Sequence, residues 1–204
     1  MPAQPARQPP DPTSRVAEPP AVSVSIDTQR MVLRPLPAEA AAALPGDRSL
    51  AAQILEAGLD PAWPLDDIAG NLRLQADAPR ADEPFGVWAV IERETDTVVG
   101  EVGFEGHPAA GTVELFFSVV PSRRRRGYAT EAARALIGWA FDQPDVHHVV
   151  ARCQPQNFAS IGTLERSGFH LVGEEEGLLH WQASDRKHAE HHHWWQPDRG
   201  HRNR

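Results

Sequence analysis

Cysteine is nearly absent from this chain, and long apolar runs are absent. Cys153 is the only cysteine among 204 residues, which excludes an internal disulfide and disfavours a cysteine-based metal site. No 18 consecutive residues are apolar, and no apolar stretch follows the arginines near the N-terminus. A membrane-spanning helix and a secretory signal are therefore not indicated, and we expect a soluble protein of the cytoplasm.

Basic residues are outnumbered by acidic ones, 20 against 28, and the formal net charge is −8. Nonspecific nucleic-acid binding is dominated by neutralisation of phosphates, so this balance argues against nucleic acid as a partner. The exception is local, because residues 123–126 are four consecutive arginines. Such a run suits one small phosphorylated ligand better than a long polyanion, while the acidic remainder suits an amine-bearing acceptor.

The two ends of the chain differ in composition from its middle. Seven of the 19 prolines fall within the first 20 residues, so we expect residues 1–21 to be disordered and residues 22–184 to form one domain. The tail at 185–204 holds five of the ten histidines. Histidines at helical spacing can bind a transition metal, yet no carboxylate or cysteine completes a ligand set, so we expect a disordered tail and no metal.

Between these ends, alternating apolar and polar residues predict strands, and a 3.6-residue period predicts helices. The expected strands are residues 30–36, 85–92, 97–104, 113–120, 146–153, 169–173 and 178–183. The expected helices are residues 38–44, 66–77, 130–141 and 157–168, with a Gly- and Pro-marked turn at 58–64. An antiparallel meander with one helical crossover, made by the 130–141 helix, indicates an α+β fold with one parallel strand pair.

The segment PSRRRRGYATEAA follows the apolar run VELFFSVV and is typical of a strand that enters a phosphate-binding turn. A pyrophosphate held by main-chain N–H groups needs consecutive donors, no bulky Cβ, and a helix N-terminus behind them. Gly127 and Ala129 meet the steric need, and the four arginines at 123–126 add cations that can reach phosphate oxygens. The same pattern also fits a solvated basic turn between a strand and a helix, so it does not decide the function by itself.

A second motif makes the interpretation specific. Asn157, Ser160, Leu164, Gly168 and Phe169 are spaced as N-x-x-S-x-x-x-L-x-x-x-G-F. This motif resembles the second cofactor motif of the GCN5-related N-acetyltransferases (GNATs), and R-x-x-G-x-A at the turn resembles their first. The turn is especially similar to that of the branch that acetylates ribosomal-protein N-termini, in which VEIGYSVxPxxRGRGYATEA stands where this chain has VELFFSVVPSRRRRGYATEA.

The resemblance, which covers roughly residues 28–183, implies the GNAT fold and acetyl-CoA as the cosubstrate. In that fold the strands at 113–120 and 146–153 splay apart, and the pantetheine arm lies in the gap against the main chain near Phe117 and Val119. The N–H near Val119 is then a candidate to polarise the thioester carbonyl. The resemblance carries the family's cofactor contacts over to Arg124, Arg125, Arg126, Gly127, Tyr128, Ala129, Thr130 and Asn157.

Acyl transfer to an amine needs a neutral nitrogen, a polarised carbonyl and a proton for the leaving thiolate. Glu114, on the strand that leads into the turn, is the candidate base, acting directly or through water. Ser160 is the candidate acid, because Leu164 stands where many family members carry a tyrosine. Structural roles remain open for each: Glu114 as an exposed strand residue, Ser160 as a first-turn helix residue, and Asn157 as a helix N-cap.

Two departures from the family pattern concern the cofactor turn and the acyl group. Arg125 stands where the family often has Gly, and Phe116 and Phe117 replace Gly-Tyr. The first places a Cβ in the turn, and the second removes a hydroxyl and narrows the acyl pocket. We expect cofactor binding to persist and acceptor choice to differ. Cys153 ends an apolar run without a flanking His and acid, which favours a buried strand cysteine over a nucleophile.

Three functions remain open at this point. The first is an N-acetyltransferase acting on a primary amine, either a protein N-terminus or a small molecule. The second is an aminoglycoside-type drug acetyltransferase, which predicts a wide acidic cleft around Asp60, Asp66, Asp67 and Glu114. The third is a non-catalytic acyl-CoA sensor, which predicts the turn without any geometry that links Glu114 and Ser160 to the thioester. A homodimer is compatible with each of them.

Overall fold

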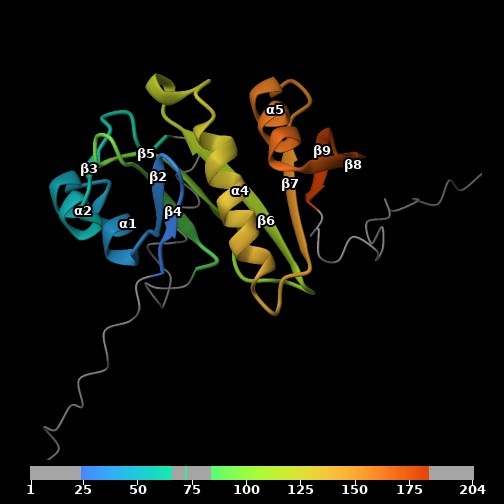
Figure 1. Cartoon of the computed structure of the whole chain (residues 1–204), viewed down its shortest axis with the longest axis horizontal. Helices are drawn as coiled ribbons and strands as arrows, with labels where there is room; N and C mark the ends of the chain where they lie inside the picture. The colour runs from blue at the N-terminus through green and yellow to red at the C-terminus, as the bar shows by residue number, and fades with distance from the viewer. Residues whose placement is uncertain (1–23, 66–71, 73–83, 184–204) are drawn as a thin grey trace, which may run out of the picture.

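The computed structural model of the chain describes residues 24–65, 72 and 84–183 (Figure 1). The segments predicted to be disordered, 1–21 and 185–204, lie outside the described residues, as does the helix predicted at 66–77 apart from Leu72. In the described part of the chain no helix is long and apolar enough to cross a membrane. The same residues contain no group of three or more His, Cys, Asp or Glu side chains that is placed to hold a metal ion.

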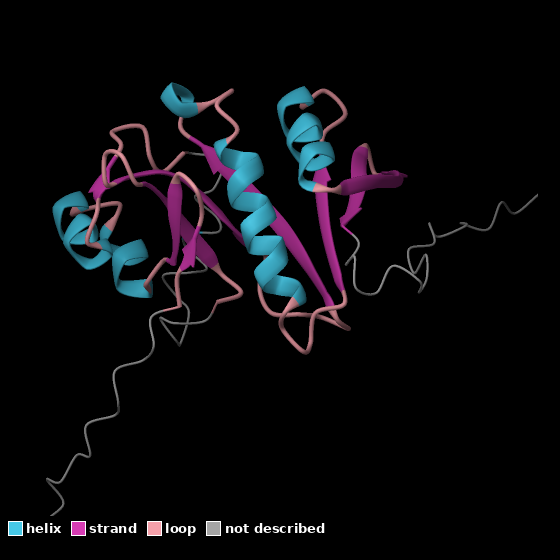
Figure 2. Cartoon of the chain, viewed as in Figure 1, coloured by secondary structure: helices cyan, strands magenta, loops and turns pink. Residues whose placement is uncertain are grey.

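One mixed sheet organises the domain (Figure 2). Its strands are β1 (Ile26–Asp27), β2 (Met31–Pro35), β3 (Gly58–Leu59), β4 (Val87–Glu92), β5 (Thr97–Phe104), β6 (Thr112–Val119), β7 (His148–Cys153), β8 (Phe169–Glu175) and β9 (Leu178–Ala183). They lie in the order β1-β2-β4-β5-β6-β7-β9-β8, with the short β3 parallel to β5. Neighbours along this path are antiparallel except β6 and β7, which are parallel. The predicted α+β fold with one parallel crossover pair is confirmed.

The described helices are α1 (Ala38–Ala43), α2 (Arg48–Leu55), α4 (Tyr128–Phe141) and α5 (Phe158–Ser167), with a 3₁₀ turn, η2, at Pro121–Arg123. Helix α4 crosses the middle of the sheet with α5 beside it, while α1 and α2 lie together at the β3 end (Figure 1). The predicted core face of α4 is confirmed, because Ala132, Leu136 and Ala140 are buried. Trp139 packs beside Trp88 of β4, with ring centroids 5.4 Å apart.

Sequence reasoning missed α2, β1 and β3. Helix α2 begins where the Asp47 side chain accepts a hydrogen bond from the Leu50 N–H, and it ends at Glu56, which has a left-handed φ of 50°. A glycine usually marks such an end, and here none does. The turn predicted at 58–64 is wrong at its start, since Gly58 and Leu59 form β3 against β5. Two-residue strands carry too little periodicity to be predicted.

Candidate functional site

Strands β6 and β7 are paired at one end and separate at the other (Figure 1). Thr112, Val113 and Glu114 pair with residues 148–150 of β7, and the pairing stops there although β6 continues to Val119. The edge of β6 from residue 115 onward therefore faces a gap. This is the splay that the resemblance implied for a parallel pair in this fold.

The ladder between β5 and β6 determines which main-chain groups of β6 face that gap. The N–H of Val120 donates to the carbonyl of Val99, and the N–H of Glu105 donates to the carbonyl of Glu114, both at 2.9 Å. Along an antiparallel strand, residues whose main-chain groups bond the neighbouring strand alternate with residues whose main-chain groups point away from it. Glu114 and Val120 bond on the side of β5, so Phe117 and Val119 direct their N–H and C=O groups away from β5 and into the gap. The predicted register places the same two residues there, and their role in binding stays a prediction.

The cofactor turn, residues 124–127, contains two left-handed residues. Arg125 has φ 61° and Gly127, the N-cap of α4, has φ 81°. A Cβ added at Gly127 would lie 3.4 Å from the Arg30 guanidinium. The first amide to bond back to Gly127 is that of Glu131, so those of Tyr128, Ala129 and Thr130 precede the helical ladder. This N-terminus of α4 has no side-chain cap, which leaves three donors for an anion.

Arg30, which precedes β2, bonds both the cofactor turn and the first turn of α4. Its Nη1 donates to the carbonyl of Arg126 at 2.7 Å, and its Nη2 lies 2.7 Å from the Glu131 carboxylate. The guanidinium carbon of Arg30 also lies 4.6 Å from the centroid of the Tyr128 ring, a cation–π distance. One arginine from a distant part of the chain therefore fixes both the turn and the first residues of α4.

Glu92, at the end of β4, is the second anchor of the turn. Its buried carboxylate accepts hydrogen bonds from Arg123 at 2.9–3.1 Å and from the Tyr128 hydroxyl at 2.6 Å. The bonds from Arg123, with those from Tyr128 and Thr95, outweigh burial and lower the pKa of Glu92 to about 2. The Arg123 guanidinium is thus held by Glu92, which corrects the expectation that it reaches a phosphate oxygen. The Tyr128 side chain also bonds Glu92. Any cofactor contact of Tyr128 belongs to its main-chain N–H.

None of these anchors was found from the sequence. Arg30, Glu92 and Glu131 lie in three distant parts of the chain: Glu131 is 101 residues from Arg30, and Arg123 is 31 residues from Glu92. No local pattern marks such contacts. The only available signal is the arginine run itself, which cannot tell a residue that faces a ligand from one that faces a buried carboxylate.

The second motif positions the start of α5 beside the gap. Asn157 is its N-cap, and its side-chain oxygen accepts a hydrogen bond from the Ser160 N–H at 3.1 Å. The helix ends at Gly168 with φ 95°, as the sequence predicted. The capping role of Asn157 is therefore present, while its pantetheine contact and the acid role of Ser160 stay predictions. Cys153 is buried, and burial raises the pKa of its thiol, which suits a buried strand cysteine.

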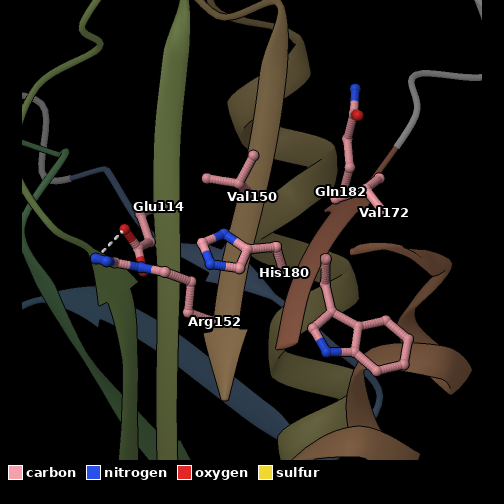
Figure 3. A pocket seen from close by; sticks show the side chains of 7 residues that line it. Glu114, Val150, Arg152, Val172, His180 and Gln182 are labelled. Carbon is pink, nitrogen blue, oxygen red and sulfur yellow. Dashed lines mark hydrogen bonds and ion pairs between the residues drawn. The ribbon is translucent and has the colours of Figure 1, made fainter. Parts of the chain in front are cut away.

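Glu114 lies in a pocket of about 270 Å³ at the paired end of β6 and β7. The pocket is lined by Glu114, Val150, Arg152, Val172, His180, Trp181 and Gln182. Figure 3 shows the labelled side chains on one side of the strands, with a helix behind the strands. Glu114 accepts two hydrogen bonds from Arg152, at 2.6 Å from Nε and 2.7 Å from Nη2. This fork-shaped ion pair is visible at the left of the pocket in Figure 3.

A second carboxylate shares this arginine. Glu105 lies 3.8 Å from the Arg152 Nη2, and its own pKa is raised by burial and by the nearby charge of Glu114. Arg152 is 44% exposed and lies within 4 Å of both carboxylates. The pocket therefore combines a carboxylate, a cation and the apolar side chains of Val150, Val172 and Trp181.

Comparison with known proteins agrees with this geometry. The family model that describes the acetyltransferase (GNAT) domain matches residues 30–170 of this sequence. This chain belongs to the GNAT family. It is 38% identical over 98 residues to YjdG, an uncharacterised N-acetyltransferase of Bacillus subtilis, across 48% of this chain and 58% of that protein. It is 31% identical over 84 residues to YnaD of the same organism, across 41% of this chain and 49% of that protein. The chain thus spans about half the length of the curated relatives it matches.

Solved GNAT structures share the fold. An acetyltransferase of Agrobacterium tumefaciens superimposes with a TM-score of 0.55 at 25% identity, covering 79% of this chain and 95% of that one. The microcin C7 self-immunity acetyltransferase MccE, solved with acetyl-CoA and AMP, superimposes with a TM-score of 0.55 at 18% identity, covering 78% of this chain and 94% of that one. The predicted GNAT fold is thereby confirmed.

Proposed function

We propose that this protein is an N-acetyltransferase that moves the acetyl group of acetyl-CoA directly to a primary amine. The observation that carries the proposal is the order of three features along β6: the Glu114 pocket at its paired end, the unpaired edge from residue 115 onward, and the turn into α4 after its last residue. GNAT membership and the MccE complex with acetyl-CoA support the choice of cosubstrate.

The phosphate groups of the cosubstrate fit the turn. The amides of Tyr128, Ala129 and Thr130 offer the donors, and Arg124, Arg125 and Arg126 offer cations. Because the backbone of Gly127 needs a left-handed φ and lacks a Cβ, a phosphate can approach the main chain closely there. These contacts bind and orient, and they take no part in bond making.

At the gap edge, the N–H of Val119 is the proposed donor to the thioester oxygen. The Val119 carbonyl already accepts a hydrogen bond from the Arg124 Nε at 2.9 Å, which fixes the peptide that follows Val119. The amine nitrogen attacks the acyl carbon, negative charge develops on the oxygen, and the C–S bond then breaks. A donor that is already aligned stabilises that charge without reorganisation.

Proton handling falls to Glu114 and Ser160. Glu114 receives the proton of the acceptor ammonium, directly or through water, after Arg152 moves toward Glu105. Ser160, partly buried in the first turn of α5, hydrogen-bonds the departing thiolate and relays to it the second proton of the attacking nitrogen, so that the hydroxyl ends neutral. The acceptor ammonium thus takes the place of the Arg152 guanidinium as the cation beside Glu114. A pocket of about 270 Å³ suits a small amine or a single N-terminal residue.

Calorimetric titration with acetyl-CoA, followed by thiol release against a panel of peptides and small amines, tests this function. Micromolar binding with thiol release supports the acetyltransferase. Binding without release from any amine supports the acyl-CoA sensor. No binding overturns the interpretation of the turn.

The aminoglycoside-type alternative is tested by the same panel. Its predicted acidic cleft involves Asp66 and Asp67, which lie outside the described residues, while Asp60 bonds within its own loop and toward Ser122. The pocket at Glu114 is small for a multi-ring drug. Turnover of an aminoglycoside faster than any single-residue amine would reverse this preference.

A further inference from the structure

A second buried carboxyl group, that of Glu101 on β5, has no part in the mechanism above. Glu101 is 1% exposed and accepts hydrogen bonds from the Trp63 indole and from the Ser118 hydroxyl. Trp63 belongs to the loop after β3, and Ser118 belongs to β6. Placing a carboxyl group away from water is costly, so a position like this one in the middle of a sheet is usually occupied by an apolar residue.

Ser118 connects Glu101 to the gap edge. It lies between Phe117 and Val119, whose main-chain groups face the gap, while its own main-chain groups face β5 in the register Glu101 to Ser118. The side chain of Ser118 is therefore bonded to the same residue that pairs with its backbone. This double attachment fixes the two peptides on either side of Ser118, and one of them carries the Val119 N–H.

Trp63 connects Glu101 to α2 and to η2, the 3₁₀ turn that precedes the cofactor turn. Trp63 is fully buried, and its carbonyl accepts a hydrogen bond from the Arg48 Nη1 at 2.6 Å. Arg48 also donates to the carbonyl of Asp60 at 3.0 Å, and the Asp60 carboxylate lies 3.4 Å from the hydroxyl of Ser122 in η2. The Glu101 carboxyl group thus joins three segments: the 60–64 loop, its own strand β5, and β6, which leads into the turn.

We propose that Glu101 is a positioning residue for acyl transfer, which acts through Ser118 to hold the Val119 N–H in line with the thioester oxygen. The proposal rests on the proposed function. An oxyanion donor works only where its direction is set before the charge develops, and a displacement of about 1 Å in such a group can cost a factor of about 100 in rate. Glu101 supplies that constraint from the side of β6 opposite to the gap.

The test compares Glu101→Gln with Ile91→Val. Glutamine keeps the shape of Glu101 and can still accept from the Trp63 indole, but it carries no charge, and its NH₂ makes the Ser118 hydroxyl an acceptor. The charge-assisted bond from Ser118 is thus replaced by a weaker neutral one. We expect kcat to fall about tenfold or more, while the calorimetric Kd for acetyl-CoA changes less than about twofold. Ile91, buried on β4, is a control for loss of core stability and should leave kcat unchanged.

Ser118 variants show whether the effect runs through β6. Ser118→Ala should lose as much kcat as Glu101→Gln, the double variant should lose little more than either, and Ser118→Thr, which keeps the hydroxyl, should retain turnover. Hydrogen exchange should also be faster at the amides of residues 117–119 in Glu101→Gln than in Ile91→Val. If Glu101→Gln does not fold, Ser118→Ala carries the same comparison.

The failure of this inference and the failure of the proposed function are distinguishable. Wild-type protein that neither binds acetyl-CoA nor releases thiol contradicts the function. Wild-type activity with equal kcat in Glu101→Gln and Ile91→Val, or with losses that multiply in the double variant, contradicts only the positioning role.

Discussion

The carboxylate of Glu92 and the guanidinium of Arg123 form a buried ion pair with three hydrogen bonds of 2.9–3.1 Å. Their side chains are 4% and 23% exposed, so solvent screens the pair weakly. The pair joins the end of β4 to the 3₁₀ turn that enters the cofactor turn. The order of the proposed phosphate site thus depends in part on a buried carboxylate of β4.

The stability of the protein should therefore decrease in acid. The pKa of Glu92 is about 2 in the folded protein and 4.5 in the absence of its partners, so the folded state favours the ionised form. The resulting stabilisation is present above pH 4.5 and is lost as the pH falls from 4.5 toward 2, by about 3 kcal/mol in total. Urea unfolding across this range measures the loss. In Glu92→Gln the free energy of unfolding should change less with pH across this window. An equal change in the variant and the wild type would contradict the assignment of the acid loss to Glu92.

Gly127→Glu should abolish acetyl-CoA binding with the fold retained. The new carboxylate would add a negative charge within the turn that the phosphate groups approach, and a Cβ at φ 81° adds strain of about 1 to 2 kcal/mol. Gly127→Ala is the matched control, because it shares the strain without the charge. Calorimetry should detect binding to Gly127→Ala and none to Gly127→Glu. Equal affinities for wild type and Gly127→Glu would remove the turn from the site.

Arg125→Gly should raise the stability of the protein. Arg125 adopts φ 61°, a conformation that glycine adopts without the Cβ strain, so the variant should gain up to about 1 kcal/mol in the free energy of unfolding. Acetyl-CoA affinity should fall modestly, because one cation is lost. Arg126→Gly loses the same charge at a residue without a positive φ, so it should gain no stability. A thermal melt of the two variants decides, and equal shifts would argue against strain at Arg125.

Glu114→Gln should lower turnover mainly at low pH. At high pH the acceptor amine is already neutral and needs no base, whereas at low pH the base is required. Arg152→Gln breaks the same ion pair but leaves the Glu114 carboxylate, so the selective low-pH loss should be missing from that variant. The pH profile of kcat/KM measures both. A Glu114→Gln profile parallel to that of wild type would exclude Glu114 as the base.

What the sequence could predict was local. The turn motif and the helix cap at Asn157 each lie within a few residues, so local spacing placed Gly127 and Asn157 at helix starts, as the structure shows. The resemblance to the family placed Phe117 and Val119 on β6, and the ladder with β5 directs their main-chain groups into the gap. The helix predicted from Thr130 begins two residues earlier, because Gly127 is already the N-cap. Motif and local geometry agree wherever one short segment determines both.

What the sequence could not predict was the pairing of charges between elements. Arg123 and Arg124 are neighbours in one run, yet one bonds the Glu92 carboxylate and the other the Val119 carbonyl. Glu101 looks like an ordinary charge on a strand until Trp63 covers it. Such roles depend on which elements the fold brings together, and contacts between distant segments leave no periodicity to detect.

The incomplete pairing of β6 and β7 also has a mechanical meaning. Five residue pairs attach β6 to β5, but only three attach it to β7, all at one end. The sheet thus has two ladders, one that ends at β6 and one that begins at β7, joined by these three pairs and by α4, which packs against both strands. A rotation about these three pairs would change the width of the gap while the hydrogen bonds within each ladder stay intact. Under a force that pulls the two ladders apart, the hydrogen bonds of these three pairs would break first.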